Sequence, residues 1–97
     1  MRPSEVLARN RNKVLEIIAR YPVANPRLFG SVARGDDIEG SDIDLLVDPD
    51  FEVTTFVHLG ELEEELEGLL GIGVDIVTPN GLLPDVTERI RSELVPL

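Results

Sequence analysis

A long amphipathic segment between two short apolar runs sets the strongest limit on the fold of this chain. Residues 43–47 and 74–77 are rich in valine, isoleucine and leucine, as buried strands are. Between them, Thr54 or Thr55 can cap a helix that ends before Gly71. Two parallel strands need a long crossover, usually a helix, so a β-α-β unit is expected. The helix would bury Phe56, Leu59, Leu62, Leu66, Leu69 and Leu70 and leave Glu61, Glu63, Glu64, Glu65 and Glu67 in solvent.

Turn, capping and periodicity signals divide the rest of the chain into further elements. The expected elements are a helix with its N-cap at Ser4 that runs up to Tyr21-Pro22, a strand over 26–29, a helical turn over 31–34, and a helix from Pro84 through Leu94. The order helix, strand, strand, helix, strand, helix predicts the α/β (α+β) class, a small mixed β-sheet with flanking helices. The order of the strands within the sheet stays open.

Size and composition favour one small globular domain. The chain has 97 residues, of which 42% are hydrophobic, enough for a modest core. We therefore expect a single domain over residues 1–97. Cysteine is absent, which excludes disulfides and thiolate metal sites. The first residues lack an apolar signal core and no segment has the length of a membrane span, which together predict a cytoplasmic protein without membrane contact.

The charge of the chain is large, negative and unevenly distributed. The formal net charge is −10, the wrong sign for binding a nucleic-acid backbone by counterion release, so no nucleic-acid polymer is expected as a partner. Residues 1–34 carry seven basic and two acidic side chains, whereas residues 35–97 carry two basic and seventeen acidic ones. The basic end is a candidate for binding phosphates or an acidic partner. Solvated helix faces of opposite charge would give the same pattern.

Asp42 and Asp44 bring two carboxylates to the first apolar run. Because alternate residues of a strand point to one face, the two side chains should project together, with Cβ atoms about 6 to 7 Å apart. Two carboxylates on a half-apolar strand repel each other unless a cation or several donors receive them. Mg²⁺ prefers a few carboxylates together with substrate phosphate oxygens, so the pair is a candidate metal site. An edge strand with an exposed polar face is the structural alternative.

A Gly-Ser pair, Gly30-Ser31, lies between the expected strand over 26–29 and the expected helical turn. Backbone N–H groups and a hydroxyl at such a position can bind a phosphate, and glycine lets the phosphate approach the backbone closely. The pair and the two carboxylates would then bind opposite sides of one triphosphate. By itself the pair is also an ordinary strand-to-helix turn, so its value lies in its spacing from Asp42 and Asp44.

This spacing resembles that of a known superfamily. Gly30-Ser31, ten residues, then Asp42-x-Asp44 is similar to the G-S-x10-D-x-D pattern of the DNA polymerase beta-like nucleotidyltransferases. The fuller segment GSVARGDDIEGSDIDLLVD resembles their minimal nucleotidyltransferase branch, the MntA-like antitoxins. The resemblance implies the nucleotidyltransferase (polymerase beta-like) fold. It also implies Mg²⁺-dependent transfer of a nucleoside monophosphate from a nucleoside triphosphate to a hydroxyl, with pyrophosphate leaving.

The resemblance further implies roles for individual residues. Gly30 and Ser31 would hold the triphosphate, and Asp42 and Asp44 would bind a pair of Mg²⁺ ions. The family uses a third carboxylate on a later strand, and Asp75 is the candidate for it. Asp75 would bind one metal ion and activate the acceptor hydroxyl, in a reaction that depends on positioning and charge neutralisation. A strand-end charge without a catalytic role is the alternative for Asp75.

Other polar residues carry less specific signals. Arg34 lies one helical step after Ser31 and can reach a phosphate or a partner, or remain an exposed basic residue. His58 is the only histidine, so it has no second histidine or cysteine with which to build a zinc site. We expect a surface or half-buried histidine there, and a packing role for Tyr21. The acidic residues expected in turns rather than at a metal are Asp36, Asp37, Glu39, Asp48 and Asp50.

The resemblance also implies a protein partner. In the resembled branch the partner is a HEPN-domain toxin, typically an RNase encoded beside the antitoxin, which is inactivated by adenylylation of a tyrosine hydroxyl. A protein adenylyltransferase antitoxin that uses ATP and Mg²⁺ is therefore implied, and the basic first helix with Arg9, Arg11 and Lys13 is its candidate partner surface. Two alternatives stay open: a non-catalytic module that neutralises the toxin by occlusion, and an enzyme that transfers a nucleotide to a small molecule. A neighbouring reading frame with the HEPN signature R-x4-6-H would favour the toxin.

Overall fold

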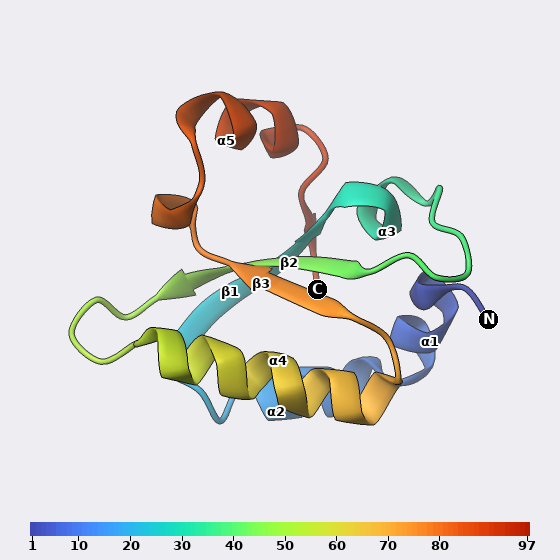
Figure 1. The fold of residues 1–97 in the computed structure, drawn as a ribbon, viewed down its shortest axis with the longest axis horizontal. Helices are drawn as coiled ribbons and strands as arrows, with labels where there is room; N and C mark the ends of the chain where they lie inside the picture. The colour runs from blue at the N-terminus through green and yellow to red at the C-terminus, as the bar shows by residue number, and fades with distance from the viewer.

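The computed structural model describes all 97 residues and places a four-stranded mixed sheet at the centre of the molecule (Figure 1). The strands are β1 (Val23–Phe29), β2 (Ile43–Pro49), β3 (Val74–Val77) and β4 (Val95–Pro96), in the order β3-β2-β1-β4. Strands β2 and β3 are parallel, whereas β1 is antiparallel to both β2 and β4. The predicted α/β class with a small mixed sheet is confirmed, as is the helical crossover between two parallel strands.

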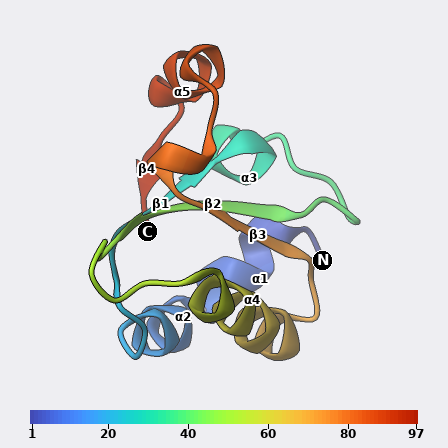
Figure 2. The ribbon, with the colours of Figure 1, turned by 60° about the vertical axis from the view of Figure 1, so that its left-hand side comes forward.

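Helices cover both faces of the sheet. They are α1 (Pro3–Arg9), α2 (Arg11–Ile18), α3 (Gly30–Arg34), α4 (Phe56–Leu70) and α5 (Pro84–Arg91), with a 3₁₀ turn η1 (Pro79–Gly81) before α5. Helices α1, α2 and α4 lie on one face, and α3 and α5 lie on the other (Figures 1 and 2). None of these helices combines the length and the apolar character that crossing a membrane requires.

The main core lies between the sheet and the α1, α2 and α4 layer. Strand β2 contributes Ile43, Leu45 and Val47, all almost fully buried, and α4 contributes Leu62 and Leu66. Because side chains alternate along a strand, the intervening residues of β2 face the opposite side of the sheet. The apolar core therefore determines that the acidic residues of β2 point toward the face that carries α3 and α5.

The single first helix predicted from Ser4 to Tyr21 is wrong, because the chain forms two helices that meet at Asn10. The backbone of Asn10 leaves the helical region at φ −115° and ψ 13°, and its side-chain amide donates a hydrogen bond to the Val6 carbonyl at 2.8 Å. Ser4 is not the N-cap either. Pro3 occupies the first turn of α1, a position that suits its fixed φ angle and missing N–H group.

The limits of three other elements also differ from the prediction. Strand β1 begins at Val23 rather than at residue 26, because Val23 pairs with Pro49 before the ladder is interrupted near Asn25, whose φ is 52°. Helix α5 ends at Arg91, short of the predicted Leu94. Strand β4, which follows it, was not predicted: its two residues pair with β1 at the sheet edge, too short a run to show a strand pattern.

Helix α4 mostly follows its prediction. Thr55 is the N-cap, and its backbone N–H in turn donates to Nδ1 of His58 at 3.1 Å, so the half-buried histidine has a capping role. The predicted apolar stripe is buried at its centre, but Phe56 is 91% exposed and does not belong to the core. Phe56 is the first residue of α4, where the chain enters the helix from the β2–α4 loop (Figure 1).

Not all acidic residues have the solvent-facing roles predicted for them. Glu63 and Glu67 accept hydrogen bonds from the backbone N–H groups of Ile76 and Val74, at 3.2 and 3.0 Å. Asp48, predicted in a turn, lies in β2 and pairs with Arg27 of β1 at 3.0 Å. These contacts join elements that are distant in the sequence, which local patterns do not report.

Candidate functional site

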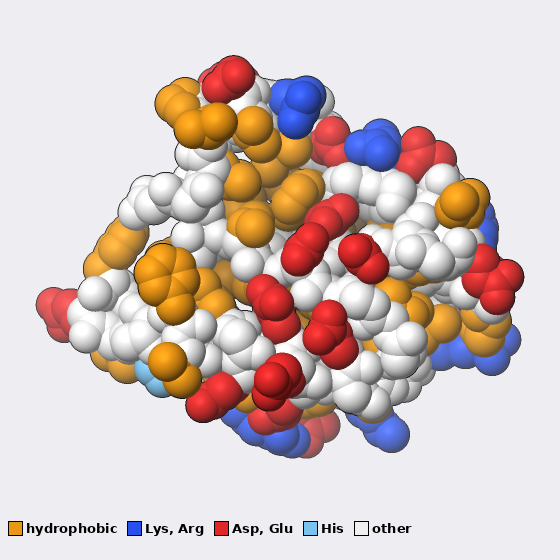
Figure 3. All heavy atoms as spheres, in the orientation of Figure 1, with side chains coloured by type: hydrophobic (Ala, Val, Ile, Leu, Met, Phe, Trp, Pro, Cys, Tyr) orange, Lys and Arg blue, Asp and Glu red, His pale blue; other side chains and the backbone are white.

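Asp44 lies at the centre of three aspartates on one face of the sheet. In the parallel ladder of β2 and β3, Asp44 is in register with Asp75. Asp42 immediately precedes β2 and lies on the same side as Asp44 by strand alternation. Asp44 is half-buried, whereas Asp42 and Asp75 are exposed. Figure 3 shows acidic side chains gathered over β2 and β3 and continuing over α4.

The electrostatics of Asp44 show how little its charge is compensated. Burial raises the pKa of its carboxyl group above the ordinary value, and the charges of Asp75 and Asp42 raise it further. Arg34 acts in the opposite direction without reversing the shift. The face thus concentrates negative charge around a half-buried carboxylate, an arrangement that a bound cation would relieve.

Two glycines make room for the aspartates. Gly30 has a left-handed backbone with φ +74°, and a Cβ atom at this position would overlap Oδ2 of Asp44. A Cβ atom on Gly73 would likewise overlap Oδ1 of Asp42. Each carboxylate therefore lies directly against a bare segment of backbone. Gly30 is among the predicted site residues, whereas Gly73 is not, because its only signal in the sequence is its position next to the run 74–77.

The donor chemistry of the three aspartates fits a hard divalent cation. Carboxylate oxygens are the ligands that Mg²⁺ prefers, and the excess negative charge around Asp44 favours cation binding. The side chains are not already arranged as a metal cage: no three acidic, histidine or cysteine residues converge on one point. Asp44 and Asp75 are brought together by strand register, while Asp42 lies against Gly73.

Helix α3 carries the residues predicted to bind phosphate, and two of them contact a carboxylate. The N–H group of Gly30 donates to Oε2 of Glu93 at 2.8 Å, and Nη1 of Arg34 donates to the same oxygen at 2.9 Å. Arg34 also pairs with Asp36 through Nε at 3.2 Å, and these two acidic neighbours raise the pKa of its guanidinium, Asp36 more than Glu93. Ser31 is half-buried beside them. Glu93 was not predicted at this site, because it reaches α3 from the far end of the chain.

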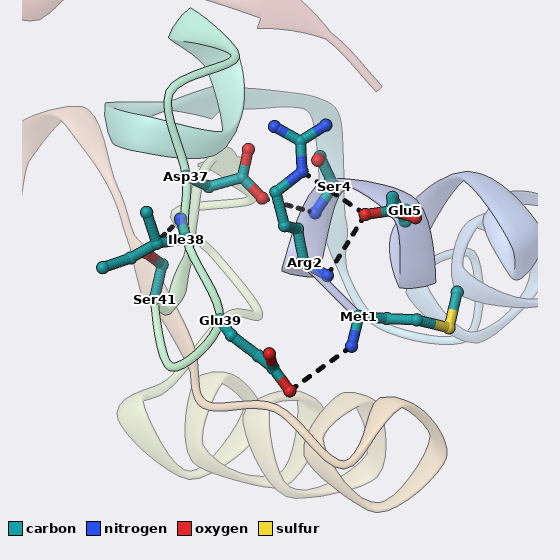
Figure 4. Close-up of polar contacts among 8 residues, drawn as sticks. All are labelled: Met1, Arg2, Ser4, Glu5, Asp37, Ile38, Glu39 and Ser41. Carbon is teal, nitrogen blue, oxygen red and sulfur yellow. Dashed lines mark hydrogen bonds and ion pairs between the residues drawn. The ribbon is translucent and has the colours of Figure 1, made fainter.

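The loop that leads from α3 to Asp42 is fixed by Asp37 (Figure 4). Asp37 is only 2% exposed, and its Oδ2 accepts a hydrogen bond from the backbone N–H of Ser4 at 2.9 Å. This hydrogen bond lowers the pKa of the Asp37 carboxyl. The Ile38 N–H donates to Oγ of Ser41 at 3.0 Å, and the amino group of Met1 pairs with Glu39 at 3.5 Å. Asp37 is thus more than the turn residue predicted, since it anchors this loop to α1.

Comparisons with known proteins agree with this fold. The family described as "Nucleotidyltransferase domain" matches residues 11–97. The chain is 39% identical over 80 residues to the protein adenylyltransferase MntA of Thermococcus cleftensis, covering 82% of this chain and 80% of that protein. It is 38% identical over 85 residues to a candidate protein adenylyltransferase of Methanocaldococcus jannaschii, covering 88% of this chain and 90% of that protein.

Solved structures place the fold in the same group. A structure named as a candidate minimal nucleotidyltransferase superposes with a TM-score of 0.84 at 45% identity, covering 97% of this chain and 95% of that one. A toxin-antitoxin crystal structure with AMP-PNP superposes with a TM-score of 0.76, covering 90% of this chain and 71% of that one. At 22% identity, this second likeness shows the fold alone. Together with the family match over residues 11–97, these findings show that the chain belongs to the nucleotidyltransferase family of enzymes.

Proposed function

We propose that this protein is an Mg²⁺-dependent protein adenylyltransferase that transfers AMP from ATP to a tyrosine hydroxyl of a HEPN-domain toxin. The observation that carries the proposal is the half-buried Asp44, registered with Asp75 and adjacent to Asp42, on the same sheet face as α3. The relatives are named as protein adenylyltransferases, which supports a protein as the acceptor. A structural neighbour is a toxin-antitoxin complex with an ATP analogue, which supports the kind of partner.

In this proposal, each part of the face has its own task. Asp42, Asp44 and Asp75 would hold two Mg²⁺ ions, which would supply neutralisation of the negative charge on the phosphate oxygens. The Gly30 N–H, the Ser31 hydroxyl and Arg34 orient the triphosphate. Because Asp44 lies against Gly30, a triphosphate bound there would have a phosphate within reach of the Asp44 carboxylate.

The proposed bond changes are those of phosphoryl transfer to a hydroxyl. The acceptor oxygen attacks the α-phosphorus while the bond to the bridging oxygen of pyrophosphate breaks. Asp75 is exposed and therefore open to the acceptor, and its carboxylate takes the hydroxyl proton. Pyrophosphate leaves with the bonding electron pair, and the products are an adenylylated hydroxyl and pyrophosphate.

The shape of the face favours an acceptor carried by another protein. Asp42 lines a groove that also includes Met1 and Gly73, and neither Asp44 nor Asp75 lines any of the main hollows of the surface. Small molecules are usually bound in concave pockets that enclose most of their surface. An open acidic face is better suited to a side chain presented by a partner surface, which would complete the site.

Mass spectrometry of the partner tests the proposal. The protein encoded beside this one is incubated with it, ATP and Mg²⁺, and its intact mass is compared with that from a variant carrying Asp42→Asn and Asp44→Asn. A gain of one or more AMP units is expected only with the intact carboxylates. Asp85→Asn is the matched control, because Asp85 is an exposed aspartate at the start of α5. If the partner gains no mass but still forms a stable complex with this protein, inhibition of the partner by occlusion would be supported instead of AMP transfer.

A further inference from the structure

The carboxylate of Glu93, near the end of the chain, contacts two residues of α3 that are proposed to bind phosphate. Glu93 lies between α5 and β4, and its Oε2 accepts hydrogen bonds from the Gly30 N–H at 2.8 Å and from Nη1 of Arg34 at 2.9 Å. Its side chain is only 18% exposed. The two donors converge on a single oxygen, so the contact is a defined site rather than a loose surface ion pair.

The chemistry of this site is that of an anion site. A backbone N–H next to a guanidinium binds a phosphate oxygen and a carboxylate oxygen by the same charge-assisted hydrogen bonds. Both donors are among the groups assigned above to the triphosphate. A phosphate and the Glu93 carboxylate therefore cannot use them at the same time.

The position of Glu93 is set by the C-terminal segment. Val95 and Pro96 pair with Leu28 and Arg27 of β1, and the Leu97 N–H donates to the Pro26 carbonyl at 3.1 Å. This short strand brings residue 93 to the end of β1, where α3 begins. The negative charge of Glu93 also raises the pKa of Asp44, which places it within electrostatic reach of the aspartates.

We propose that Glu93 is an internal competitor of the nucleotide: its carboxylate occupies the Gly30 and Arg34 donors in the nucleotide-free protein and leaves them when the triphosphate binds. The inference rests on the proposed function, because it takes these donors as the triphosphate site. As a consequence, ATP binds more weakly than it would if the Gly30 and Arg34 donors were free of Glu93. A side chain with three rotatable bonds can leave the donors without any movement of β4.

Binding of AMP-PNP with Mg²⁺, measured by calorimetry, tests the competition. Glu93→Gln keeps the shape and the acceptor oxygen but replaces a charge-assisted hydrogen bond with a neutral one, so we expect about fivefold tighter binding. Glu93→Asp keeps the charge but shortens the side chain, so it should also bind more tightly. Glu88→Gln is the matched control: it removes the same charge from exposed α5 and should leave the affinity unchanged.

Two further readouts separate competition from other effects. Glu93→Gln removes a negative charge near the aspartates, so Mg²⁺ measured without nucleotide should bind more weakly to this variant. Tighter binding of AMP-PNP by the variant therefore cannot result from tighter binding of Mg²⁺. The NMR chemical shift of the Gly30 amide proton should differ between nucleotide-free Glu93→Gln and the unsubstituted protein. The same chemical shift should change on addition of AMP-PNP in every variant. Weaker AMP-PNP binding by Glu93→Gln, or a gain no larger than that of Glu88→Gln, would overturn the competition. Failure of the unsubstituted protein to bind AMP-PNP would instead overturn the proposed function.

Discussion

At the scale of single residues, Gly30 shows how one position serves both the backbone and the site. Its φ of +74° lies in the left-handed region, and a Cβ atom there would overlap the Asp44 carboxylate. Gly30→Ala should therefore combine a backbone penalty of about 1 to 2 kcal/mol with displacement of Asp44. We expect the free energy of unfolding, measured with urea, to fall by at least about 1 kcal/mol.

Gly60→Ala is the matched control for this prediction. Gly60 lies inside α4, and a Cβ atom there would meet no neighbour within 4 Å. Alanine in a helix interior is more stable than glycine by about 0.5 to 1 kcal/mol, so this variant should unfold at higher urea. The opposite signs make the test specific. Equal effects at the two positions would mean that Gly30 has neither the left-handed backbone penalty nor the close contact with Asp44.

The residues that the sequence identifies are those whose position follows from local geometry. Asp42 and Asp44 share a face because strand side chains alternate, and their spacing from Gly30 is written in the chain. Glu93 has no such signal, because it reaches α3 only through pairing of β4 with β1. Asp37 is similar: its carboxylate accepts a hydrogen bond from the Ser4 N–H of α1, a contact between residues far apart in the sequence.

At the scale of elements, strand β3 lies at the edge of the sheet and is protected by α4. Its outward N–H groups at Val74 and Ile76 donate to Glu67 and Glu63. Unpaired edge groups favour association with other strands, so these contacts both satisfy the backbone and block pairing. Replacing Glu63 and Glu67 together by alanine should lower the free energy of unfolding by about 1 to 3 kcal/mol and increase self-association.

Light scattering and urea unfolding measure these two effects. Glu61→Ala with Glu64→Ala is the control pair, because both side chains are exposed on the same helix and make no hydrogen bond. The control pair removes the same charge and should retain stability. If it aggregates as readily as the test pair, loss of charge rather than loss of edge protection is the cause.

The junction between α2 and α4 carries a pH-dependent contact. Tyr21, just after α2, donates its hydroxyl to Oε1 of Glu65 at 2.7 Å, and this hydrogen bond is the main reason that its pKa is raised from 10.0 to about 12. The folded protein thus retains a proton that the unfolded chain loses first. Stability from this group is present below pH 10 and is lost as the pH rises through about 12.

Phenolate absorbance reads this contact directly, because Tyr21 is the only tyrosine and there is no tryptophan. Rapid mixing to alkaline pH should give a midpoint near 12, and Glu65→Gln should bring it back toward the ordinary value of 10. Circular dichroism at the same pH values identifies any unfolding. A midpoint near 10 in the folded protein would show that the hydroxyl is not bound to Glu65.

Elements were predictable in proportion to their length and periodicity. Helix α4 has a cap, a regular leucine stripe and a terminal glycine, and its prediction holds apart from Phe56 and the two glutamates, Glu63 and Glu67, that accept hydrogen bonds from β3. The first helical region has the right period, yet Asn10 breaks it through its own side-chain hydrogen bond. Strand β4 has two residues and exists only because β1 offers an edge, so no local pattern indicates it.

At the scale of the whole molecule, opposite charges are divided between two regions. The aspartates and Glu93 make the face with α3 and α5 acidic, whereas Arg9, Arg11 and Lys13 are exposed around the α1–α2 junction. None of these three basic side chains forms an internal ion pair, unlike Arg20, Arg27 and Arg34. Basic groups left unpaired in a protein of net charge −10 are available to an acidic partner surface.

Charge reversal tests whether this basic surface binds the partner. Opposite charges across an interface accelerate association, so changing Arg9, Arg11 and Lys13 to glutamate should lower the association rate at least about tenfold at low salt, with a smaller effect at high salt. Arg9→Glu with Arg11→Glu can be compared with Arg89→Glu and Arg91→Glu on α5, which apply the same change of charge on the opposite face. Surface plasmon resonance at two salt concentrations measures both pairs. Equal losses of association rate from the two pairs would assign the effect to net charge. An unchanged association rate in the triple variant would mean that the partner does not bind the basic surface. The acidic face with its aspartates would then be the remaining contact.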